Sequence, residues 1–164
     1  MSITLPAPLA KTPPETLEPR AYTAYQLDFG STSPTTIFQS AVIMVDRRPH
    51  VANAAREHTY WHVITQGQPE TARTNPTAER LIRVPWIRPV IAGWAELKVW
   101  WELRESSRHW NIWHSGVRYV VIVKALAQGG YLLKTAYPTG PYAAKWHRRF
   151  AEAQKTRRAL ADAP

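Results

Sequence analysis

The sequence predicts an α+β protein in which N-terminal helices are followed by a roughly four-stranded antiparallel sheet and a basic C-terminal helix. Two observations support this fold class. The first half contains apolar segments preceded by helix-start residues. The second half contains four runs rich in β-branched and aromatic residues, separated by short polar or glycine-containing turns. Helices followed by a series of strands are typical of α+β proteins.

The length and composition are those of one folded domain. The chain has 164 residues, of which 45% are hydrophobic and 11% aromatic, enough to form a core. Residues 1–20 differ, because they contain five prolines and few large apolar side chains. We therefore expect an extended, mobile leader or linker over 1–20 and a single domain over 21–164.

Three segments precede the expected main helices. The apolar stretch 36–45 follows Ser33-Pro34, a pair that resembles a helix start, so a helix is expected there. Residues 60–65 are β-branched and aromatic, and this pattern fits either a short strand or the end of a helix. The polar segment 67–75 contains a proline and is expected to be a loop.

Prolines mark the expected boundaries of the next helices, and turns mark those of the strands that follow. Asn75 and Pro76 predict a helix start, with asparagine as the cap and proline at the first helical position. Two further prolines interrupt the segment, so we expect two short helices, 77–84 and 86–93. The last expected element is a basic helix over 141–160. Between these helices we expect strands at 97–103, 110–114, 118–126 and 130–137.

The charge is uneven along the chain. The net charge is +9, with a pI near 10.2. Residues 94–164 hold 12 Lys and Arg against 5 Asp and Glu, a net charge of +7, whereas residues 1–93 have a net charge of +2. A basic half favours a polyanionic partner, most often nucleic acid. A solvated helix face or an acidic protein partner is the alternative explanation.

The sequence also excludes several kinds of chemistry. It contains no cysteine, which excludes disulfides, thiol chemistry and cysteine-based zinc sites. The first ten residues lack the apolar core of a signal peptide, and there is no run of 18 apolar residues that could span a membrane. We expect a cytoplasmic protein with no membrane partner.

The last expected strand carries candidate phosphate-binding groups. Thr135 and Tyr137 are two residues apart, so they should share one face of the strand, while Lys134 and Ala136 should share the other. Hydroxyls on one face of a sheet in a basic chain suggest a site that handles phosphate. The alternative is that Thr and Tyr are present because they are favourable strand residues.

Two histidines four residues apart are candidates for proton transfer. His58 and His62 share a face whether the segment is helix or strand, because the spacing fits both periods. Histidine suits proton transfer because its ordinary pKa is about 6.5. No neighbouring carboxylate completes a helical metal-binding pattern, so we expect no metal and no cofactor. A structural role beside Trp61 is an equal alternative for His58.

Several of these segments together resemble a known family. They are a Trp-His-Val-Ile-Thr segment at 61–65, Ala78-Glu79-Arg80-Leu81 followed by Trp86-Ile87-Arg88-Pro89, and Thr-Ala-Tyr-Pro at 135–138. The pattern resembles the barnase–EndoU–colicin–RelE superfamily of metal-independent ribonucleases, especially its phage-associated and polymorphic-toxin branches. The similarity covers residues 58–138, about half of the chain.

The resemblance implies an endoribonuclease toxin that cleaves RNA by attack of the 2′-hydroxyl and leaves a 2′,3′-cyclic phosphate. It implies His62, Arg80, Thr135 and Tyr137 as catalytic residues, with His58 and Glu79 as further candidates. Arginines can bind phosphate through two parallel hydrogen bonds. Our candidate RNA-binding residues are Arg83, Arg88, Lys134, Arg148 and Arg149. His109 and His114 lie in no recognisable motif, so the general acid is not assigned.

The expected partners are RNA (tRNA, rRNA or mRNA) and an acidic immunity protein or antitoxin that covers the basic half. The rival hypothesis is a non-catalytic nucleic-acid-binding or phage-structural protein with the same fold. Both fit the charge, and they differ in whether RNA is cut.

Overall fold

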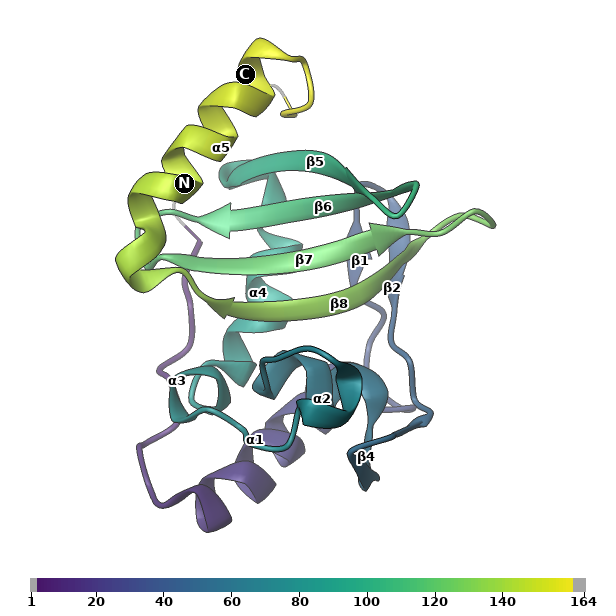
Figure 1. Ribbon diagram of the computed structural model, residues 1–164, viewed down its shortest axis with the longest axis vertical. Coiled ribbons are helices and arrows are strands. Elements are labelled where there is room, and N and C mark those ends of the chain that lie inside the picture. Colours follow the sequence, from purple (N-terminus) through teal and green to yellow (C-terminus); the bar gives the residue numbers. More distant parts are fainter. Residues whose placement is uncertain (1–2, 161–164) are drawn as a thin grey trace.

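The computed structural model describes residues 3–160, which form a curled six-stranded sheet covered by helices on both faces (Figure 1). The strand order is β1-β2-β8-β7-β6-β5. All neighbours are antiparallel except β2 and β8, which are parallel. The strand bounds are β1 Ile37–Phe38, β2 Ala41–Met44, β5 Lys98–Arg104, β6 Ser107–His114, β7 Tyr119–Ala125 and β8 Tyr131–Pro138.

The α+β class is confirmed, but the four-stranded antiparallel sheet is wrong. The expected strands form β5–β8, and two further strands make the sheet mixed. The order of elements also differs, because β1 to β4 lie between the first two helices. β3 (Pro49–His50) and β4 (Asn53–Glu57) form a separate two-stranded ribbon.

The helices are short apart from the first and the last. Their bounds are α1 Pro14–Phe29, α2 His58–Ile64, α3 Ala78–Leu81, α4 Ile87–Ala92 and α5 Ala143–Lys155. The described part of the chain also contains four one-turn 3-10 helices: η1 Glu70–Ala72, η2 Val84–Trp86, η3 Trp94–Glu96 and η4 Gly140–Tyr142. The open alternative at 60–65 is thus resolved as helix. Within residues 3–160, no helix is both long and apolar enough to cross a bilayer.

The helix expected over 36–45 is wrong, because this segment is the hairpin β1–β2. Its turn uses Gln39 and Ser40, whose φ angles are 48° and 64°. Two consecutive residues with positive φ match the right-handed twist of a hairpin. Glycine or asparagine usually marks such a turn, and neither is present here.

The extended leader expected over 1–20 also differs from the structure. α1 begins at Pro14, a residue type favoured in the first helical turn. Upstream of it the chain is held by hydrogen bonds: Leu9 N–H donates to the Ile82 oxygen (2.8 Å), and the Trp86 indole donates to the Pro6 oxygen (2.8 Å). The described part of the segment therefore packs on the domain.

Two other helix boundaries differ by a few residues. α3 begins after Thr77 rather than after the expected Asn75 cap. Pro76 instead forms an isolated bridge with Thr65. α5 ends at Lys155, and Arg157 adopts a φ of 55°, which ends the helix five residues before the expected limit at residue 160.

The two faces of the sheet are covered by different elements. The larger core lies between one face and α1–α4. On the other face, α5 buries Trp146 and Phe150 against Trp100 and Trp113. The ring centroids of Trp100 and Trp146 are 5.6 Å apart in an edge-to-face arrangement, a favourable aromatic geometry. This smaller core lies over only one part of its face.

We expect Trp146→Ala to lower the free energy of unfolding by about 3–5 kcal/mol, the usual cost of removing a buried aromatic side chain. Trp146 is 3% exposed, so its loss leaves a cavity between α5 and the sheet. Denaturant unfolding followed by fluorescence measures the change. Tyr142→Ala is the control, because Tyr142 is 66% exposed; equal effects of the two changes would contradict the docking of α5.

Candidate functional site

A groove lies on the part of the α5-side face that α5 does not cover. Cross-strand pairs show which residues share this face: Trp100 pairs with Asn111, Asn111 with Ile122, and Ile122 with Thr135. The groove has a volume of about 380 Å³, within the usual range of about 300–1,000 Å³ for ligand sites. It is lined by His62, Gln68, Glu70, Arg73, Arg104, Glu105, His109, Ile122, Lys124, Lys134 and Thr135.

The groove continues along β8 into a second hollow. The two share Gln68, Arg73, Arg104, Ile122 and Thr135, and the second extends to Arg80 and Tyr137. The floor is the sheet, and the α2–η1 segment contributes one wall. Residues from α2, η1, α3 and four strands thus face one continuous hollow.

His62 and Glu70 form the central contact of the groove wall. His62 Nε2 hydrogen-bonds a Glu70 oxygen, and the same oxygen lies 3.3 Å from His50 Nε2 and 3.6 Å from Arg73 Nε. Burial and the nearby charge of Arg73 lower the pKa of His62 to about 4, although Glu70 acts to raise this pKa. His62 is therefore neutral at pH 7.

Glu70 keeps its charge despite partial burial. Burial acts to raise the pKa of this carboxyl, but the contacts with His62 and His50 hold that pKa below its ordinary value. Glu70 is separated from His62 by eight residues and a loop. No periodic pattern in the sequence joins the two residues, which is why sequence reasoning missed Glu70.

Two further imidazole rings, those of His50 and His58, lie beside this pair. The ring centroids of His58 and His62 are 4.4 Å apart. The ring centroid of His50 lies 5.2 Å from that of His58 and 5.5 Å from that of His62. Burial lowers the pKa of His58, with Asp46 acting in the opposite direction. The ligand atoms of His50, His58, His62 and Glu70 lie within 4.8 Å of one another. Glu70 thus supplies a carboxylate from η1, although no carboxylate completes the helical metal-binding pattern within α2 itself.

The four residues implied as catalytic by the sequence lie close together. The Thr135 hydroxyl donates to the main-chain oxygen of His62 (3.1 Å). Arg80 Nη1 donates to the Thr65 oxygen (2.8 Å) and lies 3.4 Å from the Thr135 hydroxyl, and its guanidinium stacks 5.0 Å from the Tyr137 ring centroid. Burial lowers the pKa of Arg80 and raises that of Tyr137. Part of the donor capacity of Arg80 is thus used within the protein.

The expectation that Lys134 points to the face opposite Thr135 is wrong. Ile122 pairs with Thr135 and Val123 with Leu133, so Lys134 is an extra residue on β8, a β-bulge. The bulge brings Lys134 into the groove beside Thr135, whereas Ala136 is fully buried in the larger core.

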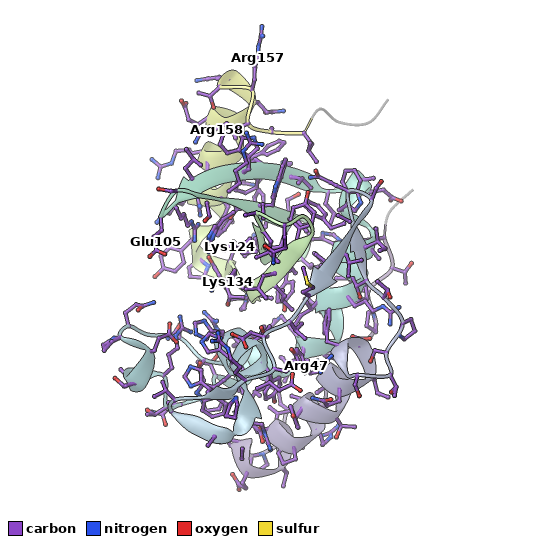
Figure 2. All side chains as sticks on the ribbon, turned by 90° about the vertical axis from the view of Figure 1, so that its right-hand side faces the viewer. Arg47, Glu105, Lys124, Lys134, Arg157 and Arg158 are labelled. Atoms are coloured by element: carbon purple, nitrogen blue, oxygen red, sulfur yellow. The ribbon has the colours of Figure 1, made fainter. Side chains whose placement is uncertain are left out.

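Lys134 joins other cations that the sequence did not single out. Figure 2 shows Lys124 and Lys134, from neighbouring strands, close together on the open side of the sheet. Arg73 and Arg104 also line the groove. His109 pairs with Lys124 across β6 and β7 and faces the same hollow. Burial, followed by Arg104 and the two lysines, lowers the pKa of His109.

Six of the expected site residues lie outside the lining of both hollows: His58, Glu79, Arg83, Arg88, Arg148 and Arg149. Glu79 is paired with Lys11 (2.8 Å) and with Arg83, whose guanidinium also donates to the Glu79 main-chain oxygen. Arg88 lies 3.9 Å from Asp28, next to α1. These contacts are surface ion pairs, which engage Arg83 and Arg88 within the protein.

The two arginines expected on the last helix have different surroundings. Arg148 is exposed on α5. Arg149 donates to both oxygens of Glu102, which also accepts from Trp100 (3.1 Å) and Arg104 (3.2 Å). Burial opposes ionisation, but these donors hold the pKa of Glu102 at about 2. Much of the charge of Arg149 is therefore compensated within the protein.

Comparison of the chain with family models, with curated proteins and with solved structures finds no match. The case for a function therefore depends on the residues and geometry of the groove.

The low pKa of Glu102 predicts a pH-dependent contribution to stability. The folded chain holds this carboxylate ionised down to about pH 2, whereas the unfolded chain protonates it near pH 4.5. The stabilisation is therefore present above pH 4.5 and is lost as the pH falls towards 2. We expect Glu102→Gln to cost on the order of 1–2 kcal/mol at pH 7, allowing for partial solvent screening.

Urea unfolding of both proteins at pH 7 and pH 3 measures this difference, which should shrink at the lower pH. Glu105→Gln is the charge-matched control, because Glu105 is exposed at the neighbouring turn. A Glu102→Gln penalty that is the same at both pH values would show that the arginine contacts do not stabilise the ionised form.

Proposed function

We propose that this protein is an endoribonuclease of the toxin type that cleaves RNA by attack of the 2′-hydroxyl on the adjacent phosphate. The observation that carries the proposal is the groove. It combines a neutral histidine hydrogen-bonded to a carboxylate with four cations from separate elements. Cleavage without a metal needs a base, cationic or hydrogen-bonding groups for the phosphorane, and an acid for the leaving 5′-oxygen. The groove contains candidates for each.

His62 is the proposed base. Its contact with Glu70 assigns the ring proton to Nε2, which leaves the lone pair of Nδ1 to accept the proton of the 2′-hydroxyl. Glu70 stabilises the imidazolium that forms, as an orienting carboxylate does in other histidine-based sites. A phosphate bound nearby adds negative charge, which raises the pKa of His62 from about 4 towards the range useful for catalysis.

The cations are the proposed electrostatic stabilisers. Arg73, Lys134 and the hydroxyl of Thr135 line the groove together with His62, so they can donate to phosphate oxygens. His109, on the far wall of the same groove, is the proposed acid. Negative charge from the phosphate favours its protonated form. Tyr137, next to Arg80, is suited to stack a base.

Toxin activity implies a partner that controls it. The proposed partner is an acidic immunity protein or antitoxin, because Lys124 and Lys134, which form no ion pair within the described residues, attract a negatively charged protein surface as well as RNA. The alternative function is a nucleic-acid-binding protein without catalysis. One observation favours it. Arg80 and Thr135 donate hydrogen bonds to the main-chain oxygens of Thr65 and His62, so these donors are not directed at a phosphate.

The two functions are distinguished by incubating purified protein with labelled total RNA in EDTA. We expect cleavage to survive chelation and to leave 2′,3′-cyclic phosphate ends, because the nucleophile is the 2′-hydroxyl. DNA should remain intact. RNA that is retained but not cut would favour the binding protein, and activity that EDTA abolishes and magnesium restores would contradict the mechanism.

Removal of the proposed base should lower the cleavage rate far more than it lowers affinity. We expect His62→Ala to reduce the rate about 10²–10⁴-fold, the usual contribution of a positioned acid or base. Thr135→Ala and Tyr137→Phe should have smaller effects. His147→Ala, at an exposed position of α5, is the control. Circular dichroism checks that each variant folds. A folded His62→Ala protein with undiminished cleavage removes His62 from the mechanism.

RNA binding should depend on the groove more than on α5. The double variant Lys124→Ala, Lys134→Ala should weaken binding, and each lost phosphate contact should reduce the slope of log K against log salt by about 0.7 for single strands. Lys145→Ala, Arg148→Ala removes the same charge from exposed positions of α5. Fluorescence anisotropy at several salt concentrations measures both. If the α5 variant loses as much affinity, the helix rather than the groove carries the RNA.

A further inference from the structure

The cluster behind the groove wall has the composition of a metal site. It joins His50 from β3, His58 and His62 from successive turns of α2, and Glu70 from η1. Among the residues described, these four offer three imidazole nitrogens and one carboxylate oxygen within 4.8 Å of one another. Four ligand atoms about 2.0–2.1 Å from a tetrahedral ion lie about 3.4 Å apart. The 3.3 Å between His50 Nε2 and Glu70 already fits this spacing.

We propose that His50, His58, His62 and Glu70 bind a divalent transition-metal ion of the zinc class. Imidazole-rich sets with one carboxylate suit Zn²⁺, Ni²⁺ or Cu²⁺, whereas Ca²⁺ and Mg²⁺ prefer oxygen ligands throughout. His62 is nine-tenths buried on its side chain and His50 is fully buried, so the ligands are held in place by the surrounding structure.

Contacts around the cluster rank the ligands. His58 Nδ1 faces the Asp46 carboxylate at 3.7 Å, the arrangement in which a second carboxylate orients an imidazole and leaves its Nε2 for the metal. In contrast, His50 Nδ1 accepts the Ala52 N–H at 3.0 Å, so its ring proton is on Nε2. Ligation by that nitrogen needs the proton to move and the Ala52 contact to break. His50 is therefore the weakest of the four ligands.

The surroundings of the cluster carry no excess of negative charge before an ion arrives. Asp46 and Glu70 are the acidic groups facing it, Arg73 and Lys134 are basic, and Arg48 pairs with Asp46 at 2.6 Å. Arg73 lies 3.6 Å from the Glu70 oxygen and is also held by the Thr65 main-chain oxygen (3.2 Å). A bound ion therefore competes with Arg73 for one carboxylate oxygen, while the other oxygen remains for the arginine.

The ion also has a consequence for cleavage, and this step rests on the proposed function. A metal on His62 Nε2 leaves the ring proton on Nδ1, so His62 can no longer accept the proton of a 2′-hydroxyl. Glu70 becomes a ligand at the same time. Zinc should therefore inhibit the ribonuclease rather than support it.

The test measures binding and cleavage separately on the full chain. Protein stripped with EDTA and dialysed is titrated with Zn²⁺ by calorimetry, and with Co²⁺ by visible absorption, which reports tetrahedral coordination. We expect one ion per chain. Glu70→Gln and His58→Gln should weaken zinc binding at least about 100-fold. His50→Gln should weaken it about 10-fold, because His50 is the weakest ligand. His147→Gln, at an exposed position of α5, is the control.

Glu70→Gln keeps the test valid if a histidine variant fails to fold, because Glu70 is 41% exposed on a surface turn. Absence of binding tighter than millimolar, or binding unaffected by Glu70→Gln, overturns the metal site. Zinc binding with no cleavage in EDTA supports the site and rejects the ribonuclease. Cleavage in EDTA that zinc inhibits in wild type, and that needs about 10-fold more zinc for the same inhibition in His50→Gln, supports both, because His50 is a ligand with no role in the proposed cleavage. Cleavage in EDTA without zinc binding rejects the metal site alone.

Discussion

The candidate site depends on how the free edge of β8 is covered. Within residues 3–160, β2 pairs with only the first two residues of β8. α2 lies along the remainder: the Thr135 hydroxyl donates to the His62 main-chain oxygen, and the Thr59 hydroxyl donates to the Leu133 main-chain oxygen (3.5 Å). Buried main-chain groups need partners: the Thr59 hydroxyl reaches a carbonyl of β8 where a strand is missing, and the Thr135 hydroxyl satisfies a carbonyl of α2. The helix that satisfies the edge is also the helix that carries the histidines.

The groove exists because α5 covers only part of its face of the sheet. Where α5 lies, Trp146 and Phe150 fill the space over Trp100, and the surface is closed. Beyond it, the same face carries Arg104, Lys124 and other polar residues over Ile122. Arg104 shares Glu102 with Arg149, whereas Lys124 and Lys134 form no ion pair within residues 3–160. Binding of an anion is thus favoured at the open part of the face.

The sequence predicts the elements of this protein better than it predicts their contacts. β5–β8 follow from β-branched composition, and His62, Arg80, Thr135 and Tyr137 are brought together as expected. The hairpin β1–β2 was missed because its turn lacks the usual residues. Glu70 and His109 reach the groove through loop closure and strand pairing, which are tertiary effects without a local pattern. The bulge that redirects Lys134 likewise leaves no mark in the alternation of residues.

Glu70 decides which chemistry His62 can perform. As a hydrogen-bond acceptor, this carboxylate holds the ring proton on Nε2 and leaves the lone pair on Nδ1, the proposed base. As a metal ligand, it shares the ion with Nε2, and the proton moves to Nδ1. The two states use the same atoms, so the proposed ion and the proposed catalysis would exclude one another at His62. A phosphate in the groove would stabilise positive charge on the ring, whereas an ion requires a neutral ring. The proposed RNA substrate and the proposed ion would therefore act on this histidine in opposite directions.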